Sequence, residues 1–206
     1  MEDYLKDVRY ALTSLIALVW LEKNELDELI RRKDRLESKL DEHSKVFELL
    51  SSNPDLDDEG IGTMLYWSIR HDIIPELNEI ERSILNITEQ IINKEYSINQ
   101  LSNSILQITK QAIVRIFNNL DSCPDGRTIN TFSIKELIWH GRNQATHIEE
   151  TDLHQPTIDF FQRLMVQYPN TFDEFKSKSM PFNILEVLDW RTYENIKNDL
   201  MLFESA

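Results

Sequence analysis

Apolar residues in the middle of the chain recur every three or four positions. Starting at Ile73, the spacings alternate between four and three, and only Lys94 breaks the order. The series consists of Ile73, Leu77, Ile80, Ile84, Ile87, Ile91, Ile98, Leu101, Ile105, Ile108 and Ala112. Such a heptad seam is typical of a helix that supercoils against a partner helix.

The N-terminal part of the chain offers a partner for this seam. Residues 4–50 contain neither Gly nor Pro and are rich in Leu, Glu, Lys and Arg, which predicts one helix on the order of 70 Å long. Residues 51–60 read as a loop, and Pro75 after Asp72 reads as a first-turn proline of the second helix. We therefore expect a long antiparallel helical hairpin, coiled-coil-like, with pairing between two chains as the alternative.

The clearest interruption of the helical pattern is the segment from Asp121 to Gly126. It divides the chain into a hairpin over residues 1–120, which contributes to the bundle, and a head over residues 121–206. Ser133 and Glu136 have the spacing of a capping box, which predicts a helix from Ile134 to about Ile148. Further helices are expected over 156–167 and 192–203, with a shorter stretch over 182–188 before the last one. We predict no strand, and an all-α fold.

Charge and cysteine content restrict the classes of function. The chain has 206 residues with 22 Lys and Arg against 36 Asp and Glu, a net charge of −14. Such a surface disfavours general affinity for nucleic acid or anionic lipid, so any contact with RNA must be local. The lone Cys123 indicates a reducing compartment. The apolar run from Ala11 to Leu21 is too short to span a membrane and lacks the flanks of a signal peptide, so we expect a cytoplasmic protein without a membrane partner.

The predicted helix from Ile134 carries the candidate chemistry. Its apolar residues fall on one side, which should face the core. They are Ile134, Leu137, Ile138, Gly141, Ala145 and Ile148. His140, Asn143 and His147 fall within about 60° of one another on nearly the opposite side. Asn143 lies one turn before His147 and could orient its imidazole, whereas Arg142 projects some 140° from His147.

The segment Arg142-Asn143-Gln144-Ala145-Thr146-His147 resembles the motif Arg, Asn, three free residues, His of the HEPN superfamily. The resemblance implies a HEPN-like helical bundle and a metal-independent endoribonuclease whose two motifs meet across a homodimer. His147 would be the acid or base, Arg142 the phosphate clamp and Asn143 the orienting residue, with His140 and Gln144 contacting RNA. It implies attack by the substrate's 2′-hydroxyl, and therefore RNA and not DNA as the partner.

The same resemblance implies a role as a toxin or anti-phage effector, with a possible antitoxin or regulatory protein as a further partner. No cofactor and no metal are expected, because His140 and His147 lie two turns apart without a suitably spaced carboxylate. Two alternatives remain open. Arg142 could pair with a carboxylate while His147 caps the helix, or the chain could be an inactive HEPN-like dimerisation and adaptor protein.

Overall fold

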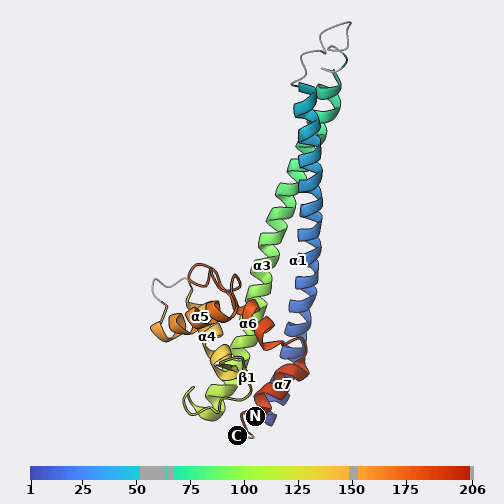
Figure 1. Ribbon diagram of the computed structural model, residues 1–206. Helices are drawn as coiled ribbons and strands as arrows, with labels where there is room; N and C mark the ends of the chain where they lie inside the picture. Colours follow the sequence, from blue (N-terminus) through green and yellow to red (C-terminus); the bar gives the residue numbers. More distant parts are fainter. Residues whose placement is uncertain (52–63, 65–66, 149–152, 205–206) are drawn as a thin grey trace. The chain divides into compact units, whose positions relative to one another are not determined.

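The computed structural model describes residues 1–51, 64, 67–148 and 153–204, and it confirms the all-α class with a long helical hairpin. Its elements are α1 (Glu2–Ser51), the π-helix η2 (Ile69–Ile73), α3 (Ile74–Phe117), β1 (Thr128–Ile129), β2 (Phe132–Ser133), α4 (Ile134–His147), α5 (Gln155–Gln167), α6 (Pro181–Leu188) and α7 (Tyr193–Leu202). Figure 1 shows them along the chain. The predicted loop over residues 51–60 lies almost wholly outside the described residues.

The chain forms two compact units. The first combines residues 1–23 with residues 96–206, and the second contains residues 24–95. Both long helices pass from one unit into the other. The division predicted from the sequence, at about residue 120, stays a prediction. By compactness, the start of α1 and the end of α3 belong to the same unit as the head.

Hydrogen bonds between α1 and α3 connect positions in opposite order along the two helices. In the first unit the hydroxyl of Tyr4 donates to the carbonyl of Ile108 at 2.9 Å. In the second unit Lys94 Nζ donates to Glu25 at 2.6 Å. The pairing is therefore antiparallel and within one chain, as predicted. Lys94, the residue that interrupts the heptad seam, is accommodated because its ammonium meets a carboxylate of the partner helix.

Pro75 lies in the first turn of α3, as predicted, but no loop separates α3 from the helical residues before it. The chain is already helical at Trp67 and Ser68, passes through the π-helical turn η2, and continues into α3. A proline inside an α-helix removes one amide donor and its ring collides with the carbonyl four residues earlier. The wider π turn immediately before Pro75 is the kind of local adjustment that accommodates both effects.

A short antiparallel pair of strands precedes α4, where the sequence predicted none. Ile129 pairs with Phe132, and Thr128 pairs with Ser133. Asn130 in the two-residue turn has a φ of 54°, a left-handed conformation that asparagine tolerates well. The strands have only two residues each, too few for an alternating pattern to show in the sequence. Their effect is to place Ser133 at the start of α4.

The head has an aromatic core, as expected from the spacing of its aromatic residues. Phe160 and Phe161 of α5 are buried, and Phe161 packs against Phe172 and stacks on Phe175. No helix among the described residues has both the length and the apolar composition needed to cross a bilayer.

Contacts with the start of α1 complete the first unit. The indole of Trp20 donates to the carbonyl of Trp190 at 2.9 Å, and the hydroxyl of Tyr193 donates to the carbonyl of Leu5 at 3.3 Å. The buried indole of Trp190 in turn donates to Asp199, which forms an ion pair with Arg127. The first residues of the chain are thus held by its last helix.

Candidate functional site

Helix α4 carries the motif residues and begins as predicted. The hydroxyl of Ser133 accepts a hydrogen bond from the amide of Glu136, and the carboxylate of Glu136 accepts one from the amide of Ser133. This capping box satisfies two amides that a helix start leaves without partners. The helix then stays regular to His147, so its geometry fixes the directions of Arg142 and His147.

The buried face of α4 is wider than the apolar pattern indicates. Gly141 faces Ile184 of α6 and Leu106 of α3, where a Cβ atom would lie 2.9 and 3.3 Å from their side chains. Helix α5 packs against α4 as well, so α4 is covered by several elements. As a result His140 and Gln144 are buried, while Ala145 is only half-buried.

His140 lies in the core of the head, not on the polar face that the sequence predicted. Its ring stacks on Phe160 with centroids 4.8 Å apart, and its Nδ1 lies 3.2 Å from the hydroxyl of Thr157. Burial lowers the pKa of His140 from 6.5 to about 4, so the imidazole is neutral at pH 7. With only 9% of its surface exposed, His140 packs in the core, and its predicted contact with RNA stays a prediction.

Gln144 also has a structural role, and its predicted contact with RNA stays a prediction. Its amide nitrogen donates to the carbonyls of Phe175 and Lys178, both at 2.7 Å. Its amide oxygen accepts a hydrogen bond from the backbone of Met180 at 3.0 Å. The side chain is fully buried, and it fastens the segment between α5 and α6 to α4.

Arg142 is half-buried and is held by neutral groups. Its Nε donates to the amide oxygen of Gln107 on α3 at 2.5 Å, and one terminal nitrogen lies 3.4 Å from Asn143 Oδ1. Within the described part of the chain, no carboxylate forms an ion pair with Arg142. The alternative in which this arginine simply neutralises an acidic residue therefore has no support among these residues.

A lysine that the sequence reasoning missed lies beside Arg142. Lys110 of α3 donates to Asn143 Oδ1 at 2.7 Å, and its ammonium lies 4.2 Å from the centre of the Trp139 ring. Burial, and secondarily the positive charge of Arg142, lower the pKa of Lys110 from 10.5 to about 8. Asn143 thus contacts two cations, and its predicted role in orienting His147 stays a prediction.

His147 is the last residue of α4 and is half-buried. Its ring lies edge-on to that of His154, with centroids 6.4 Å apart. Because α4 is regular, Arg142 and His147 point about 140° apart, so the helix itself does not bring the guanidinium and the imidazole together. α4 stays helical to His147 and does not fray between Arg142 and His147.

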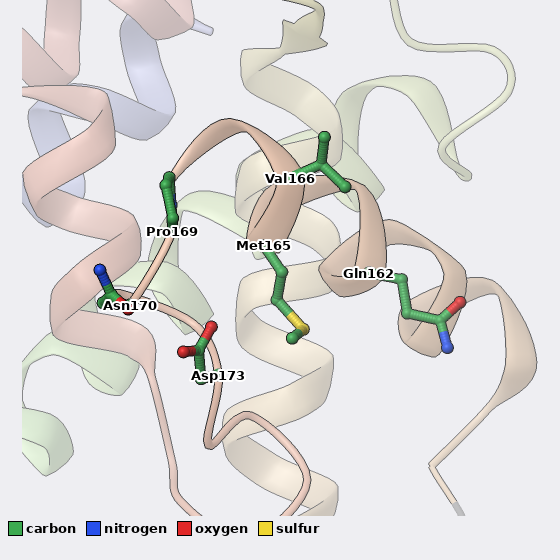
Figure 2. A pocket seen from close by; sticks show the side chains of 6 residues that line it. All are labelled: Gln162, Met165, Val166, Pro169, Asn170 and Asp173. Carbon is green, nitrogen blue, oxygen red and sulfur yellow. The ribbon is translucent and has the colours of Figure 1, made fainter.

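Neither Cys123 nor the surface depression along α5 offers a reactive or phosphate-binding group. Burial raises the pKa of the Cys123 thiol to about 11, so it is not an activated nucleophile. A depression of about 370 Å³ lies along α5 and the turn after it, and no motif residue lines it (Figure 2). It is lined by Gln162, Met165, Val166, Pro169, Asn170 and Asp173. These side chains offer one carboxylate and no cation, so it is not a site for phosphate.

The arrangement can perform one task by itself, which is to bind an anion. Two cations converge on Asn143 Oδ1, and their other partners are an amide and an aromatic ring. Comparison with protein-family models, with curated proteins and with solved structures finds no match to the chain.

Proposed function

We propose that the protein is a metal-independent endoribonuclease of the HEPN type that acts as a homodimer in the cytoplasm, as a toxin or an anti-phage effector. The observation that supports this proposal best is the state of Arg142. A half-buried guanidinium that, within the described residues, is held by Gln107 and Asn143 keeps its charge available for an anion such as a phosphodiester. That is the role that the motif resemblance assigns to Arg142.

In the proposed reaction the 2′-hydroxyl of the RNA attacks the adjacent phosphorus, and the 5′-oxygen of the next nucleotide leaves. Arg142 stabilises the charge that develops on the phosphorane oxygens. His147 takes up the proton of the 2′-hydroxyl or delivers a proton to the leaving 5′-oxygen. Asn143 positions Arg142, because its Oδ1 accepts a hydrogen bond from the guanidinium. The products are a 2′,3′-cyclic phosphate and a free 5′-hydroxyl.

The homodimer is part of the proposal because of the directions of Arg142 and His147. Two groups some 140° apart on one regular helix do not address the same phosphate from that helix alone. A second copy of α4 across a shared groove would supply the missing group. Sedimentation equilibrium tests this step, and a 24 kDa species at micromolar concentration would contradict it.

A second candidate function is that of a catalytically inactive HEPN-like dimerisation or adaptor protein. The net charge of −14 favours it, because such a surface repels the phosphates of a long RNA. In that case the hairpin would be the surface that binds a partner, and an antitoxin or regulatory protein would be a natural partner. The two candidates differ in whether the site of Arg142 and His147 turns over RNA.

The decisive experiment measures cleavage of mixed cellular RNA by the wild-type protein and by Arg142→Ala and His147→Ala. Loss of an acid or base costs on the order of 10² to 10⁴ in rate, so each substitution should abolish visible cleavage. Arg31→Ala and His71→Ala are matched controls, because Arg31 is ion-paired on the hairpin and His71 is exposed there. Cleavage should persist in excess EDTA and leave 2′,3′-cyclic phosphate ends.

Three results would count against the enzyme. Inhibition by EDTA would remove the metal-independent mechanism. Cleavage that survives both substitutions would come from another site or from a contaminant. No cleavage by a preparation shown to be dimeric would favour the adaptor.

A further inference from the structure

Lys110 reaches the motif helix from a different part of the sequence. It lies 33 residues before Asn143, on α3, and both Lys110 and Arg142 hydrogen-bond the same oxygen of Asn143. Two nitrogens at 2.7 and 3.4 Å from one oxygen lie no more than about 6 Å apart. One phosphate group, whose oxygens accept hydrogen bonds at about 2.7 to 2.9 Å, can therefore contact both cations.

Among the described residues, Lys110 and Arg142 lack the carboxylate partner that cations of the head have. Lys135 pairs with Asp125, Arg127 with Asp199, and Arg163 with Glu136. In the described chain Lys110 and Arg142 have no such carboxylate, although acidic residues outnumber basic ones in the sequence. Two like charges in a half-buried place are unfavourable unless an anion joins them.

The lowered pKa of Lys110, about 8, is consistent with this lack of an anion, because it is caused by burial and by the charge of Arg142. The ring of Trp139 supports the ammonium from one side, 4.2 Å away. Lys110 has three N–H donors, and hydrogen bonding to Asn143 uses one of them. Donors on both cations thus remain for a ligand.

We propose that Lys110 is a phosphate-binding residue which, together with Arg142, holds one phosphate group, with Asn143 as the positioning residue for both. The proposal rests on the proposed function to the extent that this phosphate is the phosphodiester that is cut. The two cations should bind a phosphate oxyanion whether or not the protein cleaves RNA. Lys110 lies on α3 and not on the motif helix α4.

The test compares binding by the wild type, Lys110→Met and Lys110→Arg. The probes are inorganic phosphate and a 2′-O-methyl oligoribonucleotide, which lacks the 2′-hydroxyl needed for cleavage. Loss of one charged contact should weaken binding of the oligonucleotide by about tenfold and reduce the slope of log K against log salt by about 0.7. Lys110→Arg should retain most of the affinity. Lys39→Met, which removes an ion-paired lysine of the hairpin, should bind like the wild type.

Thermal melting separates this role from a structural one. Because Lys110 is a half-buried cation beside another cation, Lys110→Met should not lower the melting temperature, whereas a structural lysine would lower it. If Lys110→Met binds the oligonucleotide like the wild type, with an unchanged salt slope, the proposal is wrong. Should that variant unfold, Lys110→Gln replaces it in the same comparison.

Further outcomes distinguish the two proposals. Binding by the wild type that depends on Lys110, without cleavage of any RNA, would support the phosphate site and contradict the ribonuclease. Cleavage that is unaffected in Lys110→Met would support the ribonuclease and contradict the role of Lys110. Binding of inorganic phosphate but not of the oligonucleotide would make free phosphate the ligand. Binding of neither probe by the wild type would overturn the phosphate site.

Discussion

Replacing Gln144 by methionine should strongly destabilise the head. Methionine has a similar length and no hydrogen-bonding amide, so the carbonyls of Phe175 and Lys178 and the amide of Met180 would lose their partner. Each buried polar group left unpaired costs about 1 to 3 kcal/mol. The bond to Lys178 is only partly buried, so water can replace it, and the added apolar burial offsets about 1 kcal/mol. We expect a net loss of about 2 to 4 kcal/mol.

Urea unfolding followed by tryptophan fluorescence measures this loss. Trp20, Trp139 and Trp190 all belong to the unit that contains Gln144, so the signal reports mainly on that unit. A change of this size corresponds to a decrease in melting temperature of roughly 5 to 15 °C. Gln162→Met is the matched control, because Gln162 lies exposed on α5, and it should leave the stability nearly unchanged.

A second variant tests the direction of the hydrogen bonds. Gln144→Glu places a carboxylate opposite the carbonyls of Phe175 and Lys178, which should raise the pKa of the new carboxyl group. The folded state then binds more protons than the unfolded state, so the variant should lose stability as the pH rises from 5 to 8. If Gln144→Met unfolds like the wild type while its affinity for RNA falls, Gln144 is a ligand contact after all.

Three further predictions concern α4 and the hairpin. The pKa of His140 is about 4 in the folded protein and near 6.5 when unfolded, so protonation of His140 favours unfolding. The free energy of unfolding, measured by urea titration, should therefore fall by about 2 to 3 kcal/mol between pH 7 and pH 4.5. The His140→Gln variant should show no such fall. Gly141→Ala should destabilise by about 1 to 3 kcal/mol in thermal melting, more than the helix propensity of alanine restores, because the new methyl group would press on Ile184 and Leu106. Ile105→Lys should lower helicity by circular dichroism, since Ile105 is fully buried and the substitution places a charge in the seam; unchanged melting would mean that the seam is not packed.

Features fixed by short-range patterns were predictable. The heptad spacing gave the long hairpin, and the capping box gave the first residue of α4. Lys94 broke the pattern without breaking the helix, because a lysine needs only one carboxylate across the seam, and Glu25 provides it.

The errors arise where partners are distant in sequence. An apolar stripe indicates the centre of a buried face but not its width, so the pattern puts His140 on the polar side and does not indicate the burial of Gln144. Their partners, such as Thr157 and Phe175, lie 17 and 31 residues away. Lys110 was missed for the same reason, since its helix reads as a coiled coil and nothing in that pattern indicates the contact with Asn143.

The composition of the first unit has a consequence for how the protein is made. Its N-terminal residues emerge from the ribosome first, yet Tyr193, which donates to the carbonyl of Leu5, is synthesised 188 residues later. At typical rates of translation this interval is on the order of ten seconds or more. The hairpin over residues 24–95 is complete well before the rest of the chain. The start of α1 can pair with α3 once Ile108 has been made, but its contact with Tyr193 forms only after the last helix has been synthesised.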